Sequence, residues 1–255
     1  MKDDSGMQYH VKVKPGDVGR YVLLPGDPGR VEKMAKYLDD AEFVSFNREH
    51  KVYTGTLLGE KVSIVSTGMG CPSTAIALEE LIAVGADTFI RVGTSGAVQP
   101  WLKLGDVAVV TGAIRDEGTT RQYLPIEFPA IADIEVVNAL DEACKRLGAS
   151  HYLGISQTKD SFYGEVERER MPMAFHLEER WKAWEAGGAI CSEMEAAAIF
   201  ILSSIYRKRA GGVMMVIGSD IDTLLKQKHD KEIMIKAAIE AIKILIEQDK
   251  AKAAA

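Results

Sequence analysis

The chain has 255 residues, of which 47% are hydrophobic and 27% are charged, and its formal net charge is −6. This length and balance are typical of a globular protein with one large domain or two small ones. The negative charge argues against a nucleic-acid partner, and no stretch is apolar enough to predict a membrane span. Residues 1–6 are polar, so they predict no secretory signal.

The three cysteines, Cys71, Cys144 and Cys191, have neither metal-ligand nor disulfide spacing. We interpret them as small buried hydrophobic residues, because free cysteine is among the most buried residue types. Reduced cysteines fit a reducing compartment, so we expect a cytoplasmic protein.

Short apolar runs alternate with longer helical patterns along the chain, which is typical of a layered α/β protein. The predicted strands are Tyr21–Leu24, Val52–Leu57, Val62–Ser66, Thr88–Val92, Val107–Thr111, Tyr152–Gln157 and Gly212–Ile217. The predicted helices are Arg30–Leu38, Ser73–Val84, Ile134–Leu147, Leu177–Ala186, Glu193–Arg207 and Lys231–Gln248. The turn Leu58-Gly59-Glu60 predicts a hairpin between two of the strands, so we expect a mixed sheet.

No linker, repeat or low-complexity segment divides the chain. We therefore predict a single domain over residues 1–255, with flexible tails at 1–8 and 250–255. The long aperiodic stretch 112–132 is rich in glycine, proline and charge, and loops of this length tend to carry function or to cover a site.

The first predicted strand leads into Pro25-Gly26-Asp27-Pro28-Gly29-Arg30, which turns the chain into a helix. Free amides at the helix start, Gly26 for close approach and Arg30 in the first turn would together bind an anion. An ordinary turn with a surface arginine explains the same residues, and the motif alone favours that interpretation.

A second turn, Thr67-Gly68-Met69-Gly70-Cys71-Pro72-Ser73, partly matches the dinucleotide-binding fingerprint. Ser73 stands where the fingerprint has its third glycine, and Asp87 precedes the next strand instead of ending it. A nicotinamide or flavin site is therefore disfavoured.

Arg91 is the most informative residue in the chain. It stands near the predicted end of the apolar strand Thr88–Val92, and Gly93-Thr94-Ser95-Gly96 follows. An unpaired guanidinium in a buried strand costs roughly several kcal/mol, so we expect an anion to meet it. The glycines allow close approach and the hydroxyls and amides can donate to oxyanions, which together predict a phosphate site.

Phe162 and Tyr163 stand next to Gly164 and a run of mixed charges. Two aromatic rings in this setting are suited to stack on a planar ring, although a purely structural role explains them equally well.

Ser192 is a candidate N-cap for a helix that would begin with Glu193 and Glu195. Residues two apart on a helix point about 200° away from each other, so we expect at most one of these carboxylates to face a ligand. Asp220 follows the last predicted strand, at the edge where open α/β sheets bind ligands.

The sequence contains no nucleophile–base pair, no metal-spaced histidine or cysteine cluster and no Walker-type loop. What remains is an anion site with arginines, a platform for a planar ring, and carboxylates that can accept hydrogen bonds from hydroxyl groups. A phosphate, a sugar and a base would fit these three features.

The ordered motifs resemble those of the hexameric nucleoside phosphorylases, and most closely the uridine phosphorylase branch. The resemblance covers roughly residues 10 to 245, and it includes Asn47-Arg48-Glu49, Phe128-Pro129-Ala130 and Ser192-Glu193-Met194-Glu195 besides the motifs above. It implies a single-domain, three-layer α/β/α fold with a central mixed, partly barrel-like sheet flanked by helices.

The resemblance also implies roles for individual residues. The implied phosphate ligands are Gly26, Arg30, Arg91, Thr94 and, from a neighbouring subunit, Arg48. The implied ribose-binding residues are Thr94, Met194, Glu195 and, again across the subunit interface, His10. The implied base-binding residues are Ser95, Gly96, Phe162, Glu165, Arg168, Arg170 and Asp220. Among all of these, the expected catalytic residues are Arg91, Arg30, Glu195 and Asp220.

In this family phosphate attacks C1′ of the ribose and releases the free base, so the resemblance implies a pentosyltransferase of nucleoside salvage. No cofactor is implied, since phosphate is a co-substrate. Shared sites imply a dimer as the smallest active unit, and the family assembles three dimers into a hexamer. Glu49 and Ser73 stand where some relatives hold a monovalent cation.

Two departures from the uridine branch leave the base open. A glutamine normally follows the Phe-Tyr pair and binds the uracil edge, whereas this chain has Glu165 and Val166 there. Asp220 follows the purine-branch pattern, although a helix cap explains it as well. A purine nucleoside or 5′-methylthioadenosine phosphorylase is therefore the main alternative to a uridine phosphorylase. A nucleosidase that uses water and a non-catalytic nucleoside-binding protein are further alternatives.

Overall fold

Ten strands form one sheet in the computed structural model, which describes residues 2–4, 6–218 and 231–254. The strands are β1 Tyr21–Leu24, β2 Asp39–Asn47, β3 His50–Leu57, β4 Glu60–Val65, β5 Thr88–Ala97, β6 Val107–Asp116, β7 Ala130–Ile131, β8 His151–Lys159, β9 Cys191–Glu193 and β10 Arg209–Gly218. Parallel pairs, such as β1 with β5, coexist with antiparallel pairs, such as β3 with β4. The predicted mixed sheet is therefore confirmed.

Part of this sheet closes on itself. Its order is β10-β6-β8-β9-β5-β1-β4-β3-β2, and β10 also pairs with β5. The strands β5, β10, β6, β8 and β9 therefore form a ring, which confirms the barrel-like part of the predicted fold. Because β5 lies where the ring meets the open part of the sheet, residues on β5 are close to both.

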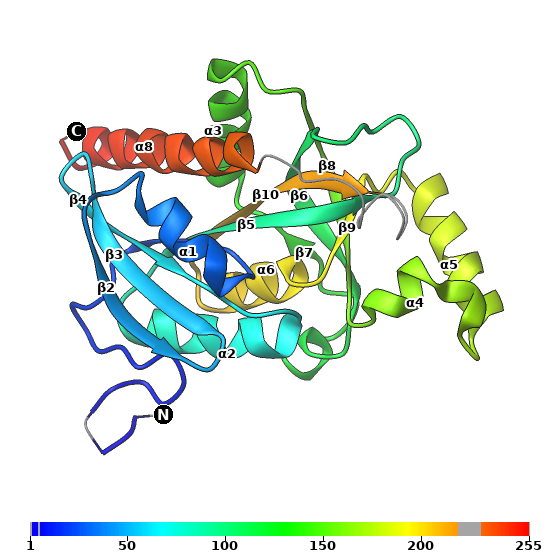
Figure 1. The fold of residues 1–255 in the computed structure, drawn as a ribbon, viewed down its shortest axis with the longest axis horizontal. Coiled ribbons are helices and arrows are strands. Elements are labelled where there is room, and N and C mark those ends of the chain that lie inside the picture. The colour runs from blue at the N-terminus through cyan, green and yellow to red at the C-terminus, as the bar shows by residue number, and fades with distance from the viewer. Residues whose placement is uncertain (1, 5, 219–230, 255) are drawn as a thin grey trace.

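Helices cover the sheet on two sides (Figure 1), with α3 and α8 on one side and α2 and α6 on the other. The helices are α1 Pro28–Ala35, α2 Cys71–Ala83, α3 Ile134–Arg146, α4 Phe162–Val166, α5 Ala174–Ala186, α6 Ala196–Ile205 and α8 Glu232–Ala254, and short 3-10 turns span Thr120–Gln122 and Arg168–Arg170. None of the described helices is long and apolar enough to cross a membrane.

Local sequence explains how the helices near the cavity begin. The side chain of Asp27 caps α1 by accepting from the backbone N–H of Gly29, and Pro28 occupies the first turn, where no hydrogen-bond donor is needed. Helix α6 is apolar on all sides, and Ala196 through Ser203 are buried. It therefore fits between α2 and the sheet, and its N-terminus lies inside the protein.

Two predicted boundaries differ from the structure in ways that affect the site, and one strand was not predicted. Strand β5 continues through Gly93–Ala97, because β10 pairs along it and β9 pairs with its end. Arg91 therefore lies within the strand. Residues Cys191–Glu193 form β9, so Ser192 is not an N-cap, and α6 begins only after Glu195. Strand β2 was not predicted, because Phe43 and Phe46 are exposed and the strand has no buried face.

The remaining predicted elements agree with the structure in type, with shifted ends. The turn at Leu58 and Gly59 joins β3 to β4, and both residues have positive φ angles, of 51° and 80°. Such angles are the reason that a two-residue hairpin turn favours glycine. Helix α8 continues to Ala254, through the segment predicted as a tail. All three cysteines are buried and free.

Candidate active site

A cavity of about 660 Å³ opens where β1, β4, β5 and β10 end. Its described lining is Gly26, Asp27, Pro28, Arg30, Glu49, Gly68, Met69, Ser73, Arg91, Thr94, Ser95, Gly96, Lys159, Phe162, Glu165, Val166, Ser192, Glu193, Met194, Glu195, Ile217 and Gly218. The carboxyl ends of strands are the usual ligand edge of an α/β sheet. The volume is that of a small-molecule site.

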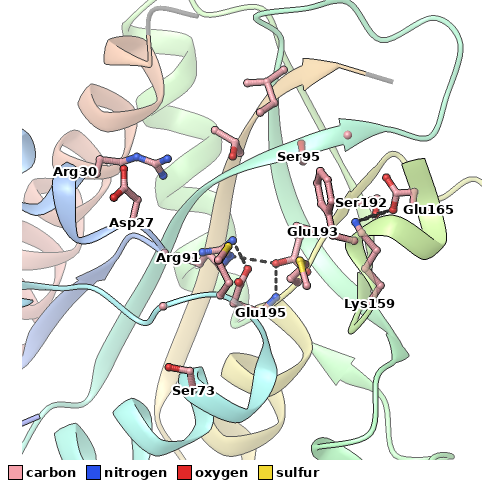
Figure 2. Close-up of a pocket in the computed structure, with 18 of the residues that line it drawn as sticks. Asp27, Arg30, Ser73, Arg91, Ser95, Lys159, Glu165, Ser192, Glu193 and Glu195 are labelled. Atoms are coloured by element: carbon pink, nitrogen blue, oxygen red, sulfur yellow. Dashed lines mark hydrogen bonds and ion pairs between the residues drawn. The ribbon is translucent and has the colours of Figure 1, made fainter. Parts of the chain in front are cut away.

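Arg91 lies at the centre of this cavity and is only 5% exposed. Its Nε donates to Glu193 Oε2 at 3.1 Å, and its Nη2 forms an ion pair with Glu195 Oε2 (Figure 2). Burial alone would lower the pKa of Arg91, but the carboxylates of Glu195 and Glu193 raise it above the ordinary value. Both carboxylates therefore face the same guanidinium, because Glu193 lies in a strand and not in the predicted helix. That at most one of them faces a ligand stays a prediction.

Two buried atoms of this cluster have no hydrogen-bond partner among the described residues: Arg91 Nη1 and Glu195 Oε2. The contact of Glu195 Oε2 with Arg91 is an ion pair without hydrogen-bond geometry. One of the two atoms is a donor and the other an acceptor, and both residues line the cavity. Buried polar atoms normally have hydrogen-bond partners, so we expect a bound ligand to supply the partners of these two atoms.

Glu195 is fixed from two sides. Its Oε1 accepts from the backbone N–H of Gly70 at 2.7 Å, and Arg91 contacts its other oxygen. Burial raises the pKa of Glu195 above the ordinary value; Arg91 opposes this rise and the nearby charge of Glu193 adds to it. Glu193 accepts from the backbone N–H groups of Glu195 and Ala196, at 2.8 and 2.9 Å. It thus holds the chain at the start of α6.

Arg30 is a second cation at the cavity, and it is 8% exposed. Its Nη1 donates to the carbonyl oxygen of Val92 at 3.0 Å, and within the described part of the chain it forms no ion pair. Burial, together with the charge of Arg91, lowers the pKa of Arg30. Since an arginine stays protonated even so, two guanidinium groups lie near each other and attract an anion between them.

Gly26 lies beside both of these features. A side chain at this position would place its Cβ 3.2 Å from the Gly68 carbonyl oxygen and 3.8 Å from Arg91 Nη1. The lack of a side chain keeps the approach to Arg91 Nη1 open. Thr94, Ser95 and Gly96 continue the cavity wall along β5, and Met194 lines it beside Glu195.

The opposite end of the cavity holds a second ionic cluster. Lys159, at the end of β8, lies 2.6 Å from Glu165 and donates to Ser192 Oγ at 2.6 Å (Figure 2). Ser192 Oγ also contacts Glu165, and it donates to Gln157 Oε1 at 2.6 Å. Glu165 was predicted at the site from the sequence and Lys159 was not, although this lysine directly precedes the Asp160-Ser161-Phe162 motif.

Only some of the residues predicted to bind the base lie together at the cavity. Phe162 lines the cavity. Arg168 and Arg170 are absent from its described lining: Arg168 lies over the ring of Trp181 at 4.5 Å and pairs with Glu178, whereas Arg170 pairs with Glu167. These partners hold both arginines away from the described lining of the cavity. Asp220 lies outside the described residues.

His10 and Arg48 are also absent from the described lining of the cavity. His10 Nδ1 lies 2.8 Å from Glu80, and Arg48 lies in the turn between β2 and β3 with a φ of 55°. Glu49 and Ser73 do line the cavity, and Ser73 Oγ donates to Glu49 Oε1 at 2.6 Å. This contact lowers the pKa of Glu49. The two residues predicted at a cation site are therefore adjacent, and the cation itself stays a prediction.

Comparison with known proteins identifies the family. The family model of the Phosphorylase superfamily matches residues 20–247. A uridine phosphorylase of Treponema pallidum is 48% identical over 95% of both chains, and a uridine phosphorylase of Thermococcus kodakarensis is 45% identical over 98% of this chain and 90% of its own. A guanosine phosphorylase of Halorubrum lacusprofundi is 36% identical over 93% of this chain and 99% of its own. The chain therefore belongs to the Phosphorylase superfamily, which confirms the resemblance seen in its motifs.

Proposed function

We propose that the protein is a uridine phosphorylase, which converts uridine and phosphate to uracil and ribose 1-phosphate. The names of the two relatives at 45% and 48% identity support this substrate. The observation that carries the proposal is a pair of buried atoms that have no hydrogen-bond partner among the described residues, Arg91 Nη1 and Glu195 Oε2. The first is a donor suited to a phosphate oxygen, and the second is an acceptor suited to a ribose hydroxyl.

The proposed reaction needs no nucleophile from the protein. A phosphate oxygen forms the new bond to C1′ while the bond from C1′ to the base nitrogen breaks, and the electron pair leaves with the base. The phosphate proton ends on the departing uracil. Arg91 and Arg30 orient the phosphate, and Glu195 holds the sugar so that C1′ faces the attacking oxygen. No cofactor enters this scheme.

The second ionic cluster is suited to the base. Phe162 offers a ring face for stacking, and the Glu165 carboxylate can accept from the N3–H of uracil. Glu165 cannot donate to the neighbouring uracil carbonyl. The ammonium group of Lys159, which lies 2.6 Å from the Glu165 carboxylate, can donate to that carbonyl. We assign this donor role to Lys159, because it lines the cavity, whereas Arg168 and Arg170 are absent from the described lining.

We further propose that two subunits share each site. His10 and Arg48 are outside the cavity of their own chain, which supports a role for them at the cavity of a neighbour. On this basis we expect a dimer as the active unit and a hexamer of three dimers. The three free cysteines are in keeping with a cytoplasmic enzyme. A monovalent cation held between subunits at Glu49 and Ser73 stays part of the proposal.

The test is an ultraviolet assay of base release from uridine, inosine and 5′-methylthioadenosine, each with and without phosphate. We expect release of uracil only when phosphate is present, together with formation of ribose 1-phosphate. Cleavage of inosine but not uridine would contradict the choice of base. Release that continues at the same rate without phosphate would instead indicate a nucleosidase.

A further inference from the structure

Glu80 is a buried carboxylate with no part in the site described so far. It lies on α2, is 5% exposed, and accepts three hydrogen bonds from the segment at residues 10 and 11. The backbone N–H of His10 is 3.0 Å from both of its oxygens, and the backbone N–H of Val11 is 2.7 Å from Oε2. The third partner is His10 Nδ1, 2.8 Å from Oε1.

The carbonyl groups of the same two residues are held from the other side. Asn47 Nδ2 donates to the His10 carbonyl oxygen at 2.6 Å, and Ser45 Oγ donates to that of Val11 at 2.8 Å. Helix α2 and strand β2 therefore fix both edges of the backbone at residues 10 and 11. So many contacts on two residues mark a segment with a defined orientation, where an N-terminal segment would ordinarily be loosely ordered.

The contact with Glu80 also determines where His10 carries its proton. The two backbone N–H groups can only donate, so Glu80 acts as an acceptor and His10 Nδ1 is the donor. The neutral ring then has Nε2 unprotonated, and Nε2 has no hydrogen-bond partner among the described residues. The side chain is 29% exposed, so the ring is anchored at Nδ1 and can present Nε2 at the surface.

We infer that Glu80 is a positioning residue for the sugar end of the nucleoside site: it fixes the orientation and tautomer of His10, so that Nε2 accepts from the 5′-hydroxyl of a nucleoside in the neighbouring subunit. This inference rests on the proposed function, and on the role that the family resemblance implies for His10, contact with the 5′-hydroxyl across the subunit interface. Glu80 itself touches no substrate. Its effect on turnover must therefore pass through His10 and through the 5′-hydroxyl.

The test compares uridine with 5′-deoxyuridine, which lacks the hydroxyl. Glu80→Gln removes the charge and places an amide against three donors, so the clamp on residues 10 and 11 loosens. We expect kcat/KM for uridine to fall about 10-fold, the effect of one lost hydrogen bond, with little change for 5′-deoxyuridine. In a His10→Ala background, Glu80→Gln should have no further effect.

Glu79→Gln is the matched control, since Glu79 lies on the same helix and its carboxylate accepts from Tyr206 Oη. It removes the same charge and should leave the ratio of the two substrates unchanged. Should Glu80→Gln fail to fold, Glu80→Asp keeps the carboxylate but shortens its reach, and the same loss for uridine is expected. Equal losses for both substrates, or full additivity with His10→Ala, would overturn the inference.

The tautomer gives a readout that does not depend on activity. Nitrogen-15 NMR of the wild-type protein at about pH 8 should show His10 protonated at Nδ1 and not at Nε2. A ring protonated at Nε2 would overturn the inference. If His10→Ala does not distinguish the two substrates while phosphorolysis of uridine is intact, the role proposed for His10 fails. If uridine is not cleaved at all, the proposed function fails.

Discussion

Glu195 shows how much the surroundings of one side chain determine what it can bind. The carboxyl group is buried, one oxygen is held by the Gly70 amide, and the other faces Arg91 without a hydrogen bond. Burial raises its pKa, which means that the protein would hold a proton there at a higher pH than water would. The ionised form accepts hydrogen bonds at both oxygens, whereas protonation would turn one of the two oxygens into a donor.

We therefore predict that uridine affinity falls at a higher pH than the ordinary pKa of a glutamate would give. Because the pKa of Glu195 is raised, the acceptor form is lost as the pH falls through a value above the ordinary 4.5 of glutamate. The dissociation constant for uridine, measured in phosphate-free buffer by calorimetry, should rise on this acid side. Glu195→Gln should bind uridine weakly, with no dependence of its affinity on the protonation of this side chain. Affinity that stays constant until the ordinary glutamate range would contradict the prediction.

The sequence could reveal Arg91 as a buried cation, but not all of its partners. Glu193 and Glu195 supply two carboxylates from the chain itself, and Nη1 is a donor left without a hydrogen-bond partner among the described residues. Helical spacing suggested that the two carboxylates point apart. That inference failed because helix α6 begins after Glu195 and leaves Glu193 in strand β9.

At the scale of elements, a cluster of polar groups joins helix α8 to the sheet. Arg209, at the start of β10, donates to Asp249 on α8 through Nη1 at 2.9 Å and Nη2 at 2.6 Å. The hydroxyl of Tyr21, on β1, donates to the same carboxylate at 2.7 Å. Burial alone would raise the pKa of Asp249, but Arg209 and Tyr21 lower it below the ordinary value. Burial of Tyr21 and its hydrogen bond to Asp249 raise the pKa of Tyr21 to about 12.

Asp249→Asn should weaken this attachment, because an amide cannot accept two hydrogen bonds from the arginine and one from the tyrosine. We expect a loss of about 2 kcal/mol in the free energy of unfolding, seen as a lower midpoint in urea at fixed protein concentration. The folded-state pKa of Asp249 is lowered, so its contribution is present above its ordinary pKa of 3.8 and is lost as the pH falls through the lowered value.

Glu240→Gln is the control for this helix. Glu240 also lies on α8, but its partner Arg146 is about half exposed, and surface pairs of this kind contribute little, about 0–1 kcal/mol. Its unfolding midpoint should be close to that of the wild-type protein. Equal losses in the two variants would mean that the general charge of α8, and not the Asp249 cluster, determines the stability.

Element types were predictable where one face of an element is buried, as in α3, whose residues Val136, Val137 and Leu140 face the core. The rest depended on pairing between distant segments. Gly93–Gly96 looked like the end of a strand, yet β10 pairs along them and extends β5 to Ala97. The three-residue strand β9 carries no periodicity at all, and it exists because β5 and β8 lie on either side of it.

For the whole molecule, the question is whether one chain holds a complete site. The cavity of one chain includes Arg30 and Arg91, but its described lining includes neither His10 nor Arg48. The cavity rim also exposes a large apolar side chain, since Met69 is 84% exposed. On the shared-site proposal, a second subunit would contribute Arg48 to this cavity, at the rim where Met69 is exposed.

A mixing experiment tests this arrangement directly. If each site takes Arg91 from one chain and Arg48 from the other, a dimer of Arg48→Ala and Arg91→Ala chains has one doubly mutated site and one intact site. Random exchange at equal concentrations makes half of the dimers mixed, so about a quarter of the wild-type activity should return. Arg30→Ala mixed with Arg91→Ala is the matched control: both residues belong to the same cavity, so every site lacks one of them and no activity should return. Equal recovery in both mixtures, or none in the first despite proven exchange of subunits, would show that Arg48 does not serve the neighbouring site.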